Sequence, residues 1–188
     1  MSPNGERDDA ALVAAALRGD NAAFSALMGR HKGSLYRFIR RYVGDADEAL
    51  DLVQETFVSC WSKLDAFDRA RPFPVWLRRI ALNKCRDWSR RRKVRHFFFG
   101  AGSISEHTPN PESTTPEVSD EARLAALDKA IAGLPQTLKE PLLLTVFDEL
   151  SHQQAASLLG VTAKAIETRV YRAKQRLRQA LNDGAPRP

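Results

Sequence analysis

The sequence predicts an all-α protein that consists of two small helical domains joined by a flexible linker. Apolar residues recur at intervals of three and four over most of the 188 residues, and no segment alternates with the period of two typical of strands. The composition changes abruptly between Gly100 and Ser119, where prolines, serines and threonines replace almost all large aliphatic residues. We therefore expect an N-terminal module at residues 1–96, a linker at 97–120, a C-terminal module at 121–183 and a tail at 184–188.

The helices expected in the N-terminal module have ends marked by glycine, aspartate and proline. Gly19-Asp20 ends the first helix, Gly33 is a candidate break in the second, and Gly44-Asp45 separates the second from the third. Pro72 and Pro74 keep the loop before the fourth helix out of helical conformation. The expected helices span residues 10–17, 21–42, 46–64 and 75 to about 92.

The third helix carries acidic residues on one face and an apolar stripe on another. Asp47, Asp51 and Glu55 are spaced by four residues and share a face, beside Gln54. Like charges at this spacing cost a few tenths of a kcal/mol per pair, so the arrangement favours a basic protein partner. A merely solvated face is the alternative. The apolar stripe comprises Ala46, Ala49, Leu50, Val53, Phe57, Cys60, Trp61 and Leu64.

The segment from Arg69 to Arg95 has the opposite charge, with 11 lysines and arginines and Asp87 as its single acid. Cations beside aromatic rings suit a single nucleic-acid strand, because cations follow the phosphates and rings stack on unpaired bases. The net charge of +6 also favours a polyanionic partner, either nucleic acid or an anionic membrane surface. Some rings must belong to the core, and Trp76 suits either role. The rings in and beside this segment are Phe67, Phe73, Trp76 and Trp88.

In the C-terminal module, the stretch from Ser151 to Arg172 has the pattern of a helix-turn-helix. Ser151 and Thr162 can each cap a helix, and Gly160 stands where the turn between them needs a positive φ angle. A helix of this kind fits the major groove of DNA, whereas an ordinary α-helical hairpin with a solvated face is the alternative. Basic residues continue to Arg178, which favours DNA. The core face is expected to carry Ile166 and Val170, and the DNA face Lys164, Thr168, Arg169 and Arg172.

Together these motifs resemble the extracytoplasmic-function sigma factors, members of the sigma-70 family. The N-terminal module resembles sigma region two: the run 51–57 with Trp61 is similar to its core-binding helix. Its helix for the −10 promoter element is matched by Trp76-Leu77, Ile80-Ala81, Asn83 and Arg86-Asp87. The C-terminal module resembles sigma region four at Leu134-Pro135, Leu142–Leu144, Leu150-Ser151, Ala156, Leu159-Gly160, Arg169 and Arg172-Ala173.

The resemblance implies a sigma factor that binds core RNA polymerase and directs promoter-specific initiation, without being an enzyme and without a cofactor or metal. Region two would bind core polymerase and open the −10 element as a single strand, and region four would read the double-stranded −35 element. An anti-sigma factor is a further implied partner, and the free protein is expected to be a monomer.

The resemblance also implies three groups of site residues. Core polymerase would contact Asp47, Asp51, Gln54, Glu55 and Phe57. The −10 element would contact Phe67, Arg69, Arg71, Phe73, Trp76, Arg79, Asn83, Arg86 and Arg90. The −35 element would contact Thr162, Lys164, Ala165, Thr168, Arg169 and Arg172.

Two local features depart from the family pattern. Pro141 stands in an expected helix and is assigned to its first turn, where proline is tolerated. The run from His96 to Phe99 is aromatic where a linker should begin, and we expect it to pack back on the N-terminal module; a surface for polymerase or an inhibitor is the alternative.

Other functions explain fewer of these features. A free-standing regulator would account for the helix-turn-helix but not for the acidic helix or the linker. A nuclease would need clustered carboxylates or a histidine beside a nucleophile, and the histidines are scattered. Cys60 and Cys85 with a histidine could hold zinc, although two buried thiols are commoner. A membrane-surface helix at 75–95 would lack a clean apolar face. No secretory signal or apolar run long enough for a bilayer is evident, so a cytoplasmic protein is expected.

Overall fold

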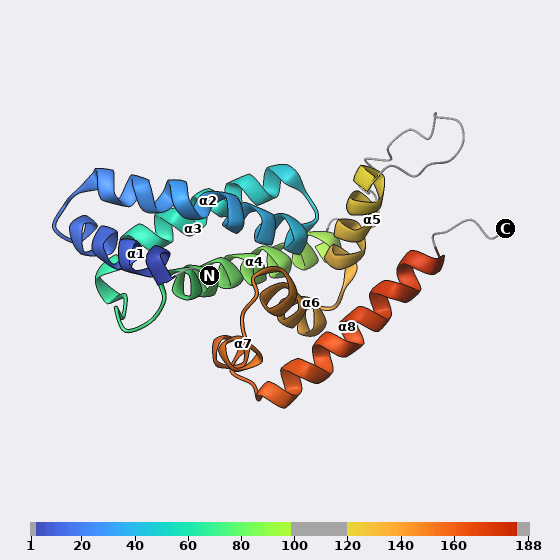
Figure 1. Ribbon diagram of the computed structural model, residues 1–188. Coiled ribbons are helices and arrows are strands. Elements are labelled where there is room, and N and C mark those ends of the chain that lie inside the picture. The colour runs from blue at the N-terminus through green and yellow to red at the C-terminus, as the bar shows by residue number, and fades with distance from the viewer. Residues whose placement is uncertain (1–2, 99–119, 184–188) are drawn as a thin grey trace.

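The computed structural model describes residues 3–98 and 120–183, and every regular element in these two ranges is helical. The N-terminal module contains α1 (Pro3–Ala16), α2 (Asn21–Val43), α3 (Ala46–Ser62), the short 3-10 helix η1 (Leu64–Ala66) and α4 (Phe73–Phe98). The C-terminal module contains α5 (Asp120–Gly133), α6 (Gln136–Leu142), the π-helical turn η3 (Leu143–Phe147), α7 (His152–Leu159) and α8 (Ala163–Asp183) (Figure 1). The all-α prediction is confirmed.

The helix ends in the N-terminal module follow from local polar residues. The Asp20 carboxylate accepts the first free N–H groups of α2, from Ala22 and Ala23, at 2.9 and 3.1 Å. The Asp45 carboxylate caps α3 in the same way by accepting from the Glu48 N–H. At the other end of α2, Gly44 ends the helix with φ of 80°. The break considered at Gly33 is wrong, because α2 runs through it without interruption. Apolar residues buried on either side of this glycine outweigh its low helix propensity.

The fourth helix is longer than the sequence pattern indicates. It begins at Phe73 and continues past Arg92 to Phe98, so the start of the expected linker is helical. The Phe98 side chain is 74% exposed, and the expectation that it packs back on the N-terminal module is therefore wrong. Phe99 lies outside the described residues, as does most of the expected linker and all of the expected tail.

The apolar stripe predicted for α3 is narrower than expected. Its centre, including Ala49, Val53 and Cys60, is buried in the bundle. Leu50 and Trp61 lie at its edges and remain 45% and 43% exposed, because a single neighbouring layer covers only part of the helix surface.

Pro141 does not occupy the first turn of its helix. It lies inside α6, five residues after Gln136, where it cannot donate a backbone hydrogen bond. The chain passes directly from α6 into the π-helical turn η3, and the Thr145 hydroxyl donates to the Pro141 carbonyl at 2.8 Å. The proline is thus accommodated by a local change of helix type.

The two modules pack against each other instead of standing apart. The C-terminal end of α2 lies beside α5 (Figure 1). Helix α2 also contacts η3, and buried Phe38 and Tyr42 join one continuous core with Ile131 and Leu143. The division into two domains could be predicted from the linker composition. The docking of one domain on the other was not predicted. It brings the basic helix α4 against charged residues of the C-terminal module.

Candidate nucleic-acid interface

The predicted helix-turn-helix is present as α7, a tight turn and α8. The Ser151 hydroxyl accepts from the Gln154 N–H at 3.2 Å, while the Gln154 side chain accepts from the Ser151 N–H at 2.9 Å. Gly160 ends α7 with φ of 69°, and the Thr162 hydroxyl accepts from the Ala165 N–H at 3.1 Å. The capping roles predicted for Ser151 and Thr162 and the turn at Gly160 are confirmed.

Helix α8 has one buried and one exposed face. Ile166 and Val170 are buried as predicted, together with Ala173 and Leu177. The six residues assigned to the −35 element all reach the surface: Thr162, Lys164, Thr168 and Arg172 are exposed, and Ala165 and Arg169 are half-buried. Lys164 donates to Glu167 at 2.8 Å, and this hydrogen bond lowers the pKa of the Glu167 carboxyl.

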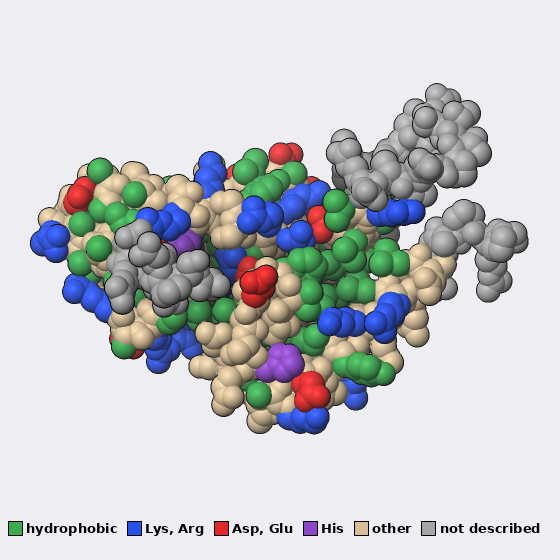
Figure 2. Space-filling view, viewed as in Figure 1, with side chains coloured by type: hydrophobic (Ala, Val, Ile, Leu, Met, Phe, Trp, Pro, Cys, Tyr) green, Lys and Arg blue, Asp and Glu red, His purple; other side chains and the backbone are tan. Residues whose placement is uncertain are grey.

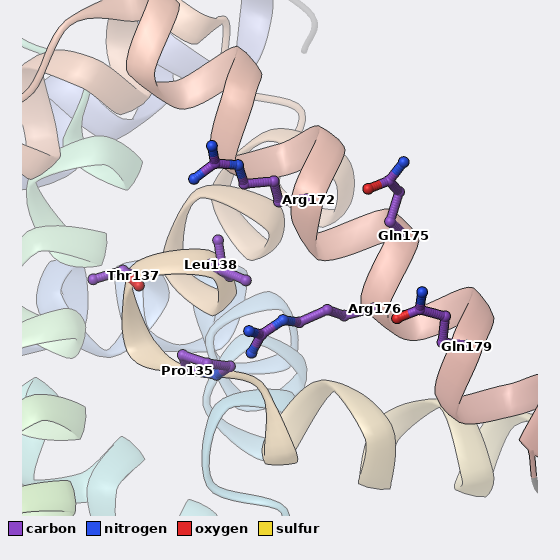
Figure 3. Close-up of a pocket in the computed structure, with 7 residues that line it drawn as sticks. All are labelled: Pro135, Thr137, Leu138, Arg172, Gln175, Arg176 and Gln179. Atoms are coloured by element: carbon purple, nitrogen blue, oxygen red, sulfur yellow. The ribbon is translucent and has the colours of Figure 1, made fainter.

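A cleft of about 520 Å³ lies between α8 and the start of α6. Arg172 and Arg176 extend from α8 toward Leu138 and Pro135, whereas Gln175 projects away from them (Figure 3). Figure 2 shows the basic side chains of α8 beside a hydrophobic surface where α5, α6 and α8 meet. Guanidinium groups one helical turn apart can contact successive phosphates or a carboxylate.

The aromatic residues near the start of α4 form an internal cluster. The ring centroids of Phe67 lie 5.7 Å from Phe73 and 5.0 Å from Trp76, in edge-to-face or tilted geometry. Phe67 and Phe73 are only 8% and 3% exposed, and Trp76 is half-buried. In this conformation Phe67 and Phe73 support the loop and are not available to stack on bases.

Most of the polar residues assigned to the −10 element are exposed, and one is held at the module boundary. Arg69 and Arg71 on the loop and Arg79, Asn83 and Arg90 on α4 are exposed, although Arg71 is paired with Asp68 and Arg90 with Asp87. Arg86 is instead half-buried beneath the C-terminal module. Its Nε and Nη2 atoms donate to the Glu140 carboxylate at 2.8 and 2.6 Å.

Sequence reasoning missed the partners of these arginines across the module boundary. The Tyr42 hydroxyl donates to Glu140 at 3.2 Å, and Arg78 donates to both oxygens of Asp148. The sequence feature that could have indicated these buried partners is the charged pair Lys139-Glu140, which lies within the apolar run from Leu138 to Leu144. A charged pair in such a run is buried only with partners.

Lys139, the other residue of this charged pair, is also buried with partners. Its ammonium group donates to the Tyr42 carbonyl at 2.9 Å and to the Ala132 carbonyl at 2.5 Å, and it lies 4.9 Å from the Tyr42 ring centroid. These carbonyls belong to the last turns of α2 and α5, which lack helical partners. Burial lowers the pKa of Lys139 to about 8 and raises the pKa of Tyr42 above its ordinary value.

The acidic face of α3 lies on the surface, away from this boundary. Asp47, Asp51 and Gln54 are exposed, and Glu55 is half-buried with its carboxylate 3.5 Å from the Lys84 ammonium. Phe57, assigned to the same partner, is only 3% exposed and belongs to the core.

An apolar groove of about 490 Å³ lies beside Gln54, between α2 and α3. Val58 is 70% exposed at this groove, and the rings of Phe24 and Trp61 lie 4.7 Å apart. Carboxylates next to exposed apolar side chains suit a protein partner better than nucleic acid.

Both cysteines are free and buried. Burial raises the pKa of the Cys60 thiol to about 12, so it is not a reactive thiolate near neutral pH. Across the described ranges, no group of histidine, cysteine and carboxylate side chains could hold a metal ion. Among the helices of residues 3–98 and 120–183, none has the length and apolar character needed to cross a bilayer.

Comparison with known proteins identifies the chain. Residues 27–95 match the Sigma-70 region 2 family, and residues 124–177 match the Sigma-70 region 4 family. The RNA polymerase sigma factor NccH of Alcaligenes xylosoxydans xylosoxydans is 41% identical over 174 residues, which cover 90% of this chain and 92% of NccH. The sigma factor CnrH of Cupriavidus metallidurans is 37% identical, with coverage of 95% and 97%. The chain therefore belongs to the extracytoplasmic-function sigma factors of the sigma-70 family.

Solved structures agree with this assignment. CnrH in complex with the cytosolic domain of CnrY superposes with a TM-score of 0.69 and 32% identity, covering 95% of this chain and 99% of CnrH. The sigma factor RpoE from Bartonella quintana, in complex with the anti-sigma factor NepR, also gives 0.69, with 25% identity and coverage of 86% and 98%. As a sigma factor, the chain directs promoter-specific transcription initiation and is not an enzyme.

Proposed function

We propose that this sigma factor divides its work among three surfaces: α3 binds core polymerase, α4 and its preceding loop bind the −10 element, and α8 reads the −35 element. The observation that carries the proposal is the segregation of charge on one chain. Acids are exposed on α3, whereas the exposed charged residues of α4 and α8 are mostly basic. Opposite charges attract different partners to different elements.

The polymerase surface consists of Asp47, Asp51, Gln54 and Glu55, all of which reach solvent. Val58 and Trp61 extend it with exposed apolar area. Phe57 supports this surface from the core and does not reach the partner in this conformation.

The −10 surface uses Arg69, Arg71 and Arg79 for the phosphates, with Asn83 and the edge of Trp76 for bases. Arg86 and Arg90 extend this basic surface along α4, while buried Phe67 and Phe73 hold the loop in place. Extruding a base from a duplex costs a few kcal/mol, which the polymerase contacts and the trapped base offset.

The −35 surface begins at the N-terminal end of α8. Thr162, Lys164, Ala165 and Thr168 face outward within the first two turns, where a recognition helix reads base edges. Arg169 and Arg172 follow further along the helix and contact phosphates.

Regulation by an anti-sigma factor is a further part of the proposal. CnrH and RpoE share this fold; CnrH has been solved in complex with the cytosolic domain of CnrY, and RpoE in complex with the anti-sigma factor NepR. We infer that this chain has a partner of the anti-sigma class, is monomeric when free, and acts in the cytoplasm at the nucleoid when bound to polymerase. We also propose that the N-terminal module ends at residue 96, that residues 97–120 form the linker, and that the C-terminal module begins at residue 121.

Run-off transcription with purified core polymerase on a pool of genomic promoter fragments tests the proposal. We expect specific start sites that require both this chain and core polymerase. Substitution of Asn83 and Trp76 by alanine should leave core binding intact but reduce permanganate reactivity at the −10 element. If the chain binds DNA tightly without core and never directs initiation, the free-standing regulator becomes the better interpretation.

A further inference from the structure

Helix α1 contributes one charged side chain to the interior of the N-terminal module. Asp9 is only 3% exposed, and its carboxylate accepts from the Arg30 guanidinium at 2.6 Å and lies 2.8 Å from the His31 Nε2 atom. A carboxylate this deeply buried is retained only with partners, and both of these partners lie on α2. Asp9 precedes residues 27–95, the stretch that matches region 2, so that match assigns it no role.

His31 connects this carboxylate to the aromatic cluster of the proposed −10 surface. Its ring centroid lies 5.3 Å from that of Phe73, and the Phe73 centroid lies 5.9 Å from that of Trp76. Both distances are within the range over which aromatic rings attract each other. One row of contacts therefore runs from α1 through α2 to α4, and its members are Asp9, His31, Phe73 and Trp76.

The contact with Asp9 fixes the orientation of the His31 ring. Burial lowers the pKa of His31, so the ring is neutral near pH 7. A neutral imidazole has one N–H group, and a carboxylate beside Nε2 keeps the proton on that nitrogen. The ring is then held at one edge by this hydrogen bond as well as by its contact with Phe73.

The Trp76 ring depends on its aromatic neighbours for its position. It is half-buried, and the Phe67 and Phe73 rings lie beside it. The Trp76 backbone N–H donates to the Pro72 carbonyl at 3.3 Å, which anchors the main chain but not the ring. A displacement of Phe73 would therefore move the Trp76 ring.

We propose that Asp9 and His31 are positioning residues for the −10 surface. Asp9 orients the His31 ring, and His31 supports Phe73. Phe73 in turn sets the position of the Trp76 ring. This inference rests on the proposed contact between the edge of Trp76 and a base of the −10 strand. Simple attachment of α1 to α2 is the alternative role of Asp9, and it would leave the Trp76 ring unaffected.

The first measurement follows the Trp76 ring in the full chain without DNA. Nuclear magnetic resonance gives one indole N–H signal for each of the three tryptophans, and Trp76→Phe identifies the Trp76 signal by its loss. Asp9→Ala and His31→Ala should each shift or broaden this signal. Val13→Ala is the matched control, because it truncates a fully buried side chain one helical turn after Asp9 and should leave the signal in place. Circular dichroism verifies that each variant retains its helices.

The second measurement is the rate of open-complex formation with core polymerase, from permanganate reactivity at a promoter identified by run-off transcription. We expect Asp9→Ala and His31→Ala each to lower this rate about five-fold, and Val13→Ala to lower it less than about two-fold. In a chain that already carries Trp76→Ala, His31→Ala should lower the rate less than about two-fold further, because the support then has no ring to position.

An unmoved Trp76 signal in both variants, or equal effects of Asp9→Ala and Val13→Ala, would overturn the inference. An undiminished effect of His31→Ala in the Trp76→Ala chain would also overturn it, since His31 would then act by another route. Failure of the proposed function gives a different result. If Trp76→Ala opens the promoter normally, or if the chain never directs initiation, the −10 role of Trp76 is wrong. The indole signal then decides by itself whether Asp9 and His31 position the ring.

Discussion

At the scale of single residues, Lys139 shows how a buried charge can join two helices. Its ammonium group donates to the Tyr42 carbonyl of α2 and to the Ala132 carbonyl of α5, one in each module. Both carbonyls would otherwise remain without a helical hydrogen bond. Burial makes the protonated form less favourable and lowers the Lys139 pKa to about 8.

The lowered pKa predicts a stability change in alkaline solution. The folded chain releases the Lys139 proton near pH 8 and the unfolded chain only near pH 10.5, so the unfolded state binds more protons between these values. The contribution of Lys139 to stability therefore rises with pH, by about 2 kcal/mol from pH 8 to about pH 10. Urea unfolding of the unaltered chain and of Lys139→Met at both pH values measures the difference.

The control for this prediction is Lys174→Met, which removes an exposed lysine from α8. Its difference from the unaltered chain should stay constant with pH. A Lys139→Met difference that is equally constant would show that the folded pKa is not depressed.

Capping residues could be predicted from the sequence because their partners are close along the chain. Ser151, Gly160 and Thr162 act within a few residues of themselves, and the structure confirms all three. The partners of Arg86 and Arg78 are 54 and 70 residues away, and no local pattern indicates which acid they meet. The burial of Phe67 and Phe73 likewise depends on tertiary contacts that composition does not specify.

At the scale of elements, the exposed acids of α3 predict a charge-dependent contact with polymerase. Asp47→Lys combined with Asp51→Lys should reduce core affinity at least about ten-fold, because attraction to a basic partner becomes repulsion. Helicity should be retained, since the replaced side chains are exposed and neither is a helix cap. Fluorescence titration of labelled chain with core polymerase measures the affinity.

A charge-matched control excludes a simple effect of net charge on this titration. Asp65→Lys combined with Glu149→Lys changes the net charge by the same amount at exposed positions outside α3. This control should bind core nearly as well as the unaltered chain. Equal losses in the two double variants would contradict a specific role for the α3 face.

Helix α8 predicts a change in the salt dependence of promoter binding. Arg169→Ala should weaken binding to double-stranded promoter DNA and reduce the slope of log affinity against log salt by roughly one unit, if one phosphate contact is lost. Arg178→Ala, at an exposed position further along α8, is the matched control and should leave the slope unchanged. An unaltered slope for Arg169→Ala would assign this residue to a protein contact.

At the scale of the whole molecule, the all-α class and the charge segregation could be predicted, but the docking of the modules could not. Periodicity and composition report on each element separately. Docking depends on a few ion pairs and on apolar residues such as Ile131 and Leu143, which the same pattern would bury within a separate module. A partner can open such a boundary only by binding the open state more tightly than the ion pairs and the shared apolar core hold the closed one.

Gly44 gives the docked arrangement a consequence for tolerance to mutation. Gly19, Gly44 and Gly160 all have positive φ, a conformation that other residues adopt only with strain and that asparagine tolerates better than most. A Cβ atom at Gly44 would lie 2.8 Å from the Ala132 Cβ across the boundary, whereas nothing lies within 4 Å of one at Gly19 or Gly160.

Asparagine should therefore cost only backbone strain at Gly19 and Gly160, but at Gly44 it should also force the modules apart, which small-angle scattering would detect as a larger radius of gyration.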